Sequence, residues 1–211
     1  MPYPIMAPGD TWYKGTILRS SIGAITFEDT PSQRDDIVES WNADINNDGS
    51  IKCQVWKYKN VEINSQTYET YMLEIAGNGS GKISFNENSM GAFTLTTATS
   101  VDDIFTLLEN FYNTNLLDFS LVKNATLMFA LLPSLSTIDV STWNVDNITN
   151  MGAMFYTTGL TTITGLSNWN VSNVTIMQEM FRRCVNLTSL EDIANWKISK
   201  VTNIAYMFQD C

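Results

Sequence analysis

A Met-Phe pair recurs in the C-terminal half of this chain at nearly constant spacing, and this repeat constrains the fold more than any other feature. Successive pairs lie 26, 26 and 27 residues apart: Met128-Phe129, Met154-Phe155, Met180-Phe181 and Met207-Phe208. Each of three tryptophans lies 12 residues before the next Phe: Trp143, Trp169 and Trp196. A fixed period of this length is typical of stacked repeats, in which each unit covers the apolar side of its neighbour.

Within each repeat, the apolar residues between the Trp and the Phe fall three positions apart, as at Val145, Ile148 and Met151. This spacing predicts a short helix with one apolar side. The segment upstream of each Trp, such as LTTITGL at residues 160–166, predicts a short strand. The repeating unit is therefore predicted to be one strand followed by one short helix.

These patterns divide the chain into four regions. We expect the repeats over residues 116–211, and a capping helix and connector over residues 96–115, because Ser100 and Asp103 have capping-box spacing ahead of an apolar stripe that runs to Tyr112. Residues 16–95 alternate strand-forming runs with turn signals such as NNDGS and GNGSG, which predicts a small antiparallel β domain. Residues 1–15 hold three prolines and are expected to form an extended arm.

The repeats resemble the BspA-like leucine-rich repeats of bacterial surface proteins. The segment LTTITGLSNWNVSNVTIMQEMF at residues 160–181 follows that family's order of Leu, Trp, Val, Met and Met-Phe almost position for position. The resemblance weakens in the first repeat, which lacks the Trp and has Phe119 and Ala125 at the Val145 and Met151 positions. It implies an α/β repeat fold, a leucine-rich-repeat (BspA-like) solenoid preceded by a small antiparallel β domain.

Composition argues against several classes of function. The chain has 22 acidic and 12 basic residues, and its net charge of −10 disfavours nucleic acid and anionic lipid as partners. Its apolar runs are shorter than the roughly 20 residues needed to cross a bilayer, so we expect no membrane insertion. It has no histidine, the commonest general base and zinc ligand. We therefore expect a non-enzymatic protein with no catalytic residues and no cofactor.

Two loop motifs have alternative interpretations. In DINNDGSIK, Asp44, Asn46 and Asp48 match the first half of a calcium-binding loop, but Val55 stands where the loop needs a bidentate Glu. A turn between two strands explains the same residues. The segment GSGKIS is similar to a phosphate-binding loop, but Ile83 follows its Lys in place of Ser or Thr.

Two sets of residues recur at equivalent positions of the repeats. The tryptophans Trp143, Trp169 and Trp196 are candidates for a binding surface that stacks on sugars or peptides, although aligned aromatic rings also stack on one another inside repeat proteins. Cys184 and Cys211 each lie three residues after the Phe, and they fit either a ladder of small buried residues or a redox pair.

Both ends of the chain suggest contacts with other molecules. The arm carries Tyr3, Ile5 and Trp12, which are candidates for anchoring it to a neighbouring subunit. The last repeat ends three residues after Phe208 without a polar cap. An open apolar end invites association, so we expect either further chain beyond Cys211 or a partner docked there.

The family resemblance implies adhesion or surface recognition. No secretion signal follows Met1, so we expect a bacteriophage virion protein, a fibre or decoration on the virion surface. Its N-terminal region would contact other virion proteins, and its repeats would face a glycan or protein on the host surface. Closed symmetry makes a homo-oligomer the expected state of a fibre. The alternatives are an adhesin on the cell surface of a gut bacterium and an accessory module of a carbohydrate-active enzyme.

Overall fold

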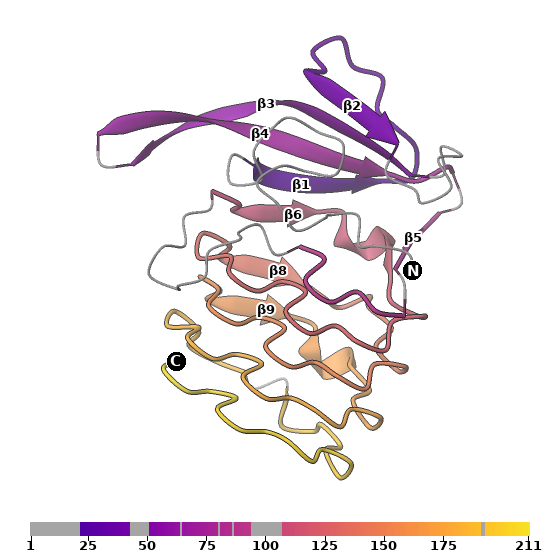
Figure 1. The fold of residues 1–211 in the computed structure, drawn as a ribbon, viewed down its shortest axis with the longest axis vertical. Helices are drawn as coiled ribbons and strands as arrows, with labels where there is room; N and C mark the ends of the chain where they lie inside the picture. The colour runs from indigo at the N-terminus through magenta and orange to yellow at the C-terminus, as the bar shows by residue number, and fades with distance from the viewer. Residues whose placement is uncertain are drawn as a thin grey trace.

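The computed structural model describes residues 22–42, 51–63, 65–79, 81–85, 87–93, 107–190 and 193–211. Within these ranges the chain forms β-strands, turns and two three-residue 3-10 helices, η3 (Thr114–Leu116) and η4 (Leu166–Asn168). Figure 1 shows a sheet at one end of the molecule, from which a stack of coiled segments continues to the C-terminus. One hydrophobic core cluster runs through both parts, from Ile22 to Met207.

The N-terminal sheet has five strands in the order β2-β3-β4-β1-β6. Strand β1 (Ile22–Glu28) pairs in parallel with β4 (Gln66–Ala76) on one side and β6 (Asn110–Tyr112) on the other. Strand β3 (Lys52–Ile63) is antiparallel to both β4 and β2 (Glu39–Asn42). The sheet is therefore mixed, and the prediction of an antiparallel domain is wrong on this point. The β3–β4 hairpin extends beyond the other strands (Figure 1).

Successive residues of strand β1 from Ile22 to Phe27 are all buried, so the strand is covered on both faces of the sheet. Ile25 and Phe27 belong to the hydrophobic core that continues into the stack. Gly23 allows Thr70 of β4 to approach closely, since a Cβ at Gly23 would lie only 2.8 Å from the Thr70 Cβ. The centre of the sheet therefore has little room for larger side chains.

Below the sheet, the chain winds through four coils: coil 1 (residues 119–144), coil 2 (145–170), coil 3 (171–197) and coil 4 (198–211). Short parallel strands connect successive layers: β5 (Ile83–Ser84) pairs with β7 (Leu117–Asp118), and β8 (Thr137–Asp139) pairs with β9 (Thr162–Thr164). Strands β1, β6, β8 and β9 lie one below another (Figure 1). The side of the stack that contains β8 and β9 thus continues the succession of strands from the sheet.

A second line of contact keeps the coils in register. Single parallel bridges connect five residues in turn: Asn88, Asn124, Asn150, Ile176 and Asn203. From Asn124 onward these residues are 26, 26 and 27 positions apart, so each residue lies over its counterpart in the next repeat. The sequence period is therefore the length of one coil.

The predicted α/β leucine-rich-repeat solenoid is wrong, because the described residues contain no α-helix. The apolar positions keep a spacing of three, and on an α-helix with about 3.6 residues per turn, positions nine apart lie on opposite sides. A four-residue turn joins Val145 to Ile148, whose N–H donates to the Val145 carbonyl at 3.0 Å. The next N–H of the stripe, that of Met151, instead donates across the layer to Ile176 at 2.9 Å. Turns and cross-layer bonds replace the expected helix.

Each coil bends at two residues with positive φ that lie four positions apart. In coil 2 they are Ala153 (φ 52°) and Thr157 (φ 54°). Their N–H groups donate to the carbonyls of Gln178 and Arg182 in coil 3, at 2.8 and 2.9 Å. The left-handed conformation is unfavourable for residues other than Gly, and these cross-layer hydrogen bonds offset its cost. The other coils have the same pair: Leu127 and Leu131, Glu179 and Arg183, Tyr206 and Asp210.

The phenylalanines of the Met-Phe pairs form a column through the stack. Ring centroids are 5.8 Å apart from Phe129 to Phe155 and from Phe155 to Phe181, and 5.7 Å apart from Phe181 to Phe208. The last two pairs of rings are parallel within 4°. This column joins each layer to the next by apolar contact in addition to backbone hydrogen bonds.

The expected capping helix over residues 96–115 falls partly on residues that the structure leaves undescribed, among them Ser100 and Asp103. In the described part, Phe111 and Tyr112 lie in strand β6, so the helix does not reach them. The sheet instead covers this end of the stack. Phe93 packs against Phe27 of β1 and Phe111 of β6, with ring centroids 5.7 and 5.3 Å apart.

Candidate binding surfaces

The three tryptophans form a second column inside the stack. Trp143 and Trp169 have exposed fractions of only 3% and 4%, and Trp196 is half-buried. Neighbouring rings are stacked with centroids 6.2 and 6.1 Å apart. Each indole N–H donates to a carbonyl of the preceding layer: Thr114, Val140 and Leu166. The first two rings therefore have no surface free for a ligand, and only Trp196 is partly accessible.

Threonine side chains form a ladder on the outside of the coils. The hydroxyls of Thr149, Thr175 and Thr202 each donate to a carbonyl one layer back, at 3.2, 3.0 and 3.1 Å. The acceptors are Lys123, Thr149 and Thr175. Each hydroxyl oxygen can still accept hydrogen bonds from outside. The ladder fixes these oxygens at regular intervals along the stack.

Asparagines act in two ways on the same side. Asn147 and Asn173 donate their side-chain N–H to the carbonyls of Ser120 and Asp146 one layer back, at 2.7 and 2.9 Å. Asn150 instead accepts from the N–H of Gly152, at 2.9 Å, and so shapes the turn that follows it. The repeated Asn residues therefore have structural roles within the stack.

The two short strands β8 and β9 carry a small polar surface. Their middle residues, Ile138 and Ile163, are buried in the core. The residues on either side are exposed: Thr137, Asp139, Thr162 and Thr164. Because β8 and β9 pair in register, Thr137 lies beside Thr162 and Asp139 beside Thr164. This surface offers hydroxyl and carboxylate groups in two adjacent rows.

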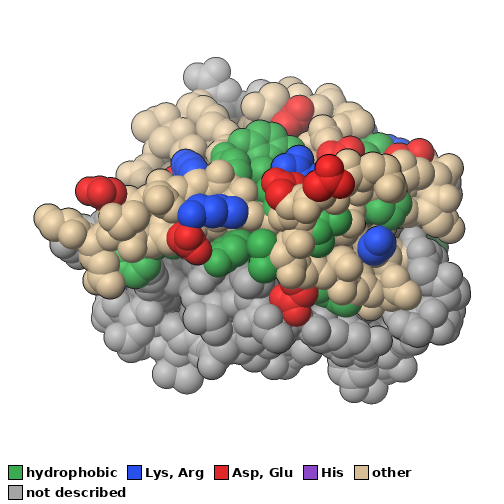
Figure 2. All heavy atoms as spheres, turned by 90° about the horizontal axis from the view of Figure 1, so that it is seen from above, with side chains coloured by type: hydrophobic (Ala, Val, Ile, Leu, Met, Phe, Trp, Pro, Cys, Tyr) green, Lys and Arg blue, Asp and Glu red, His purple; other side chains and the backbone are tan. Residues whose placement is uncertain are grey.

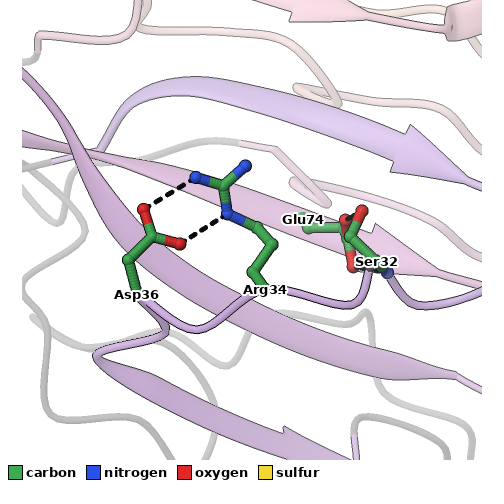
Figure 3. Close-up of polar contacts among 4 residues, drawn as sticks. All are labelled: Ser32, Arg34, Asp36 and Glu74. Carbon is green, nitrogen blue, oxygen red and sulfur yellow. Dashed lines mark hydrogen bonds and ion pairs between the residues drawn. The ribbon is translucent and has the colours of Figure 1, made fainter.

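The sheet holds a buried carboxylate for which no sequence pattern predicts a special role. Glu74 of β4 is fully buried. One carboxylate oxygen accepts from the Ser32 N–H at 3.0 Å, and the other accepts from the Ser32 hydroxyl (Figure 3). The first oxygen also accepts from the Gln54 side-chain N–H at 2.7 Å. With both oxygens occupied, Glu74 holds the loop after β1 against the sheet.

The same loop carries an exposed charged pair. Arg34 makes two hydrogen bonds to Asp36, at 2.8 and 2.7 Å (Figure 3), and its guanidinium carbon lies 4.3 Å from the centroid of the Trp56 ring. The hydrogen bond from Arg34 lowers the pKa of Asp36, and the same bond raises the pKa of Arg34. Figure 2 shows acidic, basic and hydrophobic side chains intermingled at this end of the molecule.

The three cysteines are free thiols. Cys53 is buried, and burial, followed by the nearby charge of Glu74, raises the pKa of its thiol. Burial also raises the pKa of Cys184, whose thiol donates to the carbonyl of Phe155 at 3.1 Å. Cys211 makes the equivalent bond to Phe181 at 3.0 Å, one layer on. Cys184 and Cys211 therefore occupy the same rung position.

Coil 4 leaves an apolar surface at the C-terminal end of the stack. Its exposed large apolar side chains are Ile198, Ile204, Tyr206 and Phe208. A shallow hollow beside Phe208 is lined by Leu187, Leu190 and Cys211, together with Thr188 and Ser189. This end contrasts with the opposite end, where the sheet covers Phe93.

The other candidates from the sequence lie outside the described residues. They are the calcium-loop residues Asp44, Asn46 and Asp48 and the arm residues Tyr3, Ile5 and Trp12. Across the described ranges, no group of three or more Cys, Asp and Glu side chains is placed to hold a metal ion. Nor does any helix in those ranges have the length and apolarity to cross a membrane.

A family model described as "Mycoplasma protein of unknown function, DUF285" matches the chain twice, over residues 70–162 and over residues 133–211. The two matches together run from strand β4 to the end of coil 4, and they overlap within coils 1 and 2. No curated protein and no solved structure matches the chain.

Proposed function

Because the chain belongs to the DUF285 family, which is associated with BspA-like repeats, we propose that it is a non-enzymatic binding or display protein. The observation that carries this proposal is the threonine ladder of Thr149, Thr175 and Thr202, which repeats one polar contact on each layer. Neighbouring layers of parallel backbone are about 4.8 Å apart. Stacked repeats of this kind form extended surfaces that can contact a large partner at many points.

The chemistry of the coil surface favours a partner with many hydroxyl or amide groups. The exposed residues of β8 and β9 are Thr137, Asp139, Thr162 and Thr164. Threonine hydroxyls both donate and accept hydrogen bonds, as glycans and peptide backbones do. The net charge of −10 further favours a neutral or basic partner over a polyanion. We therefore propose a surface glycan or a surface protein as the ligand.

Two settings fit this function. The family description names Mycoplasma, which favours a bacterial cell, and the family's association with BspA-like repeats supports an adhesin on its outer surface. The second setting is a bacteriophage virion. The two unlike ends of the molecule favour it, because the sheet covers one end of the stack while the coils are free to face outward. In a fibre or decoration, the N-terminal region would contact other virion proteins, and the chain would form a homo-oligomer.

Binding of the full chain to glycan and surface-protein arrays tests the proposal. The informative variant is Thr137→Lys with Thr162→Lys, which places two charges on the β8–β9 surface. Its matched control is Glu62→Lys, an exposed position on the β3–β4 hairpin. We expect the double variant to reduce binding at least about tenfold and the control to leave it unchanged. Equal binding by all three proteins would remove the β8–β9 surface from the proposal.

The setting is tested separately by mass spectrometry of two preparations. Peptides of this chain released by proteolytic shaving of intact cells would support the cell-surface setting. Peptides found in purified phage particles would support the virion setting. Finding the chain in the cell interior alone would contradict both.

A further inference from the structure

The edge of coil 4 that faces away from coil 3 presents backbone N–H groups at alternate residues. In coil 3, four alternate N–H groups donate to coil 4 across 2.8 to 3.0 Å: those of Met177, Glu179, Phe181 and Arg183. Their counterparts one repeat later are Ile204, Tyr206, Phe208 and Asp210, whose N–H groups have no partner within the described residues. A row of unpaired donors is a template for pairing with another backbone.

The side chains at this edge extend the aromatic columns of the stack. Phe208 is parallel to Phe181 within 2°, and Trp196 is parallel to Trp169 within 4°. Each of these two outer rings is packed on one face by its neighbour in the stack and is partly exposed to solvent. A partner that covers them would therefore bury aromatic surface as well as receive hydrogen bonds.

We propose that this edge docks a further coil of the same type, offered by another polypeptide segment that runs parallel to coil 4. Such a segment places carbonyl groups opposite the four N–H groups, as coil 4 does for coil 3. It also places an apolar ring over Phe208, as Phe208 lies over Phe181. The contact continues the coil-to-coil interface within the molecule and stands apart from the recognition role of the coil sides.

A second copy of this chain does not fit the same edge. Two identical edges would bring N–H donors against N–H donors, which cannot pair. The opposite end of a second copy is covered by the sheet, where Phe93 packs against Phe27 and Phe111. The hydrogen-bond polarity of the edge therefore selects a segment with free carbonyls.

A peptide of residues 171–184, with Ser in place of Cys184 and blocked ends, serves as the probe. It is titrated into the full chain, and amide hydrogen exchange is followed by mass spectrometry or NMR. We expect slower exchange at Ile204, Tyr206, Phe208 and Asp210. Phe208→Asp should weaken binding at least about tenfold, because it removes the apolar contact and adds a charge. The matched control, Leu121→Asp, changes an exposed apolar residue of coil 1 and should bind as the wild type does.

Three results would overturn the proposal. The first is no binding of the peptide at millimolar concentration. The second is equal binding by a peptide that carries Asp at the Phe181 position, because the apolar contact would then be irrelevant. The third is self-association of the chain alone in sedimentation experiments that Phe208→Asp abolishes, because a second copy would then occupy the edge.

Discussion

Coils 3 and 4 have nearly the same residue pattern but very different surroundings. Phe181 and Phe208 hold the same position, yet the first has an exposed fraction of 0% and the second 47%. The backbone bends are also equivalent, with φ of 58° at Glu179 and 60° at Tyr206. The coils differ because, among the described residues, coil 3 has a neighbouring layer on both sides and coil 4 on only one. Burial in this stack is therefore determined by the next layer, not by the repeat sequence.

The largest expected contrast in stability comes from a charge placed at equivalent positions of coil 3 and coil 4. Met177 is fully buried, while Ile204, its counterpart in coil 4, has an exposed fraction of 48%. Met177→Asp should lower the free energy of unfolding by at least about 4 kcal/mol, because the carboxylate would be buried without a partner. Ile204→Asp should change it by less than about 1 kcal/mol. Urea unfolding measures both, and equal losses would contradict the account.

Removal of the aromatic ring from each coil should give a smaller contrast. Phe181→Ala leaves a cavity between Phe155 and Phe208 and should cost about 3–5 kcal/mol of unfolding free energy. Phe208→Ala removes a ring that is packed on one side only, and should cost about 1–2 kcal/mol. Thermal unfolding of the two variants gives the comparison. A larger loss for Phe208→Ala would mean that coil 4 is covered in solution.

Substitution of Gly165 tests how closely coil 2 approaches coil 1. Gly165 has φ of 92°, and a Cβ there would lie 2.3 Å from the Cα of Ser141 in the layer above. Gly165→Ala should cost about 3 kcal/mol through strain and displacement of coil 1. The control is Gly81→Ala, with φ of 85° and no atom within 4 Å of the added Cβ, which should cost about 1 kcal/mol. Similar losses in chemical denaturation would show that the layers are further apart than described.

The smallest expected effect is on acid stability, near the sheet end of the stack. The pKa of Asp118 is lowered overall from its ordinary value. Burial, the largest single influence, raises it, but the hydrogen bonds from Ser120 and Ser84 and the charge of Lys82 together outweigh burial. A lowered folded-state pKa stabilises the fold above the unfolded value of 3.8, and this contribution is lost as the pH falls through the folded pKa. Asp118→Asn should therefore flatten the stability curve below about pH 4, by less than about 1 kcal/mol. If the dependence of stability on pH were unchanged in the variant, the carboxylate of Asp118 would not contribute to acid stability.

The sequence predicted the period of the structure better than its secondary structure. The 26- to 27-residue interval between Met-Phe pairs is also the interval between bridged residues such as Asn150 and Ile176. The apolar residues Ile148 and Met151 are buried, but in turns rather than in a helix. A spacing of three predicts a helix because each short segment alone resembles one side of a helix. The cross-layer hydrogen bonds that replace the helix depend on a neighbouring coil, which local patterns do not contain.

The sheet and its polar contacts were less predictable. Strand β6 joins β1 in parallel across more than 80 residues of sequence, and no local signal specifies such a partner. Glu74 and Ser32 are 42 residues apart, and in an alternating strand Glu74 resembles an ordinary exposed position. The tryptophan positions were recognised from the sequence, but their burial follows from stacking, which leaves only Trp196 partly exposed.

Residue-resolved amide hydrogen exchange tests the stacking most directly. The N–H groups of Met177, Glu179 and Phe181 donate across layers, whereas those of Ile204, Tyr206 and Phe208 have no partner among the described residues. We predict slow exchange at the first three and fast exchange at their counterparts in the isolated chain. Equal protection in both sets, or a continuous helical pattern of protection through residues 171–184, would contradict the account.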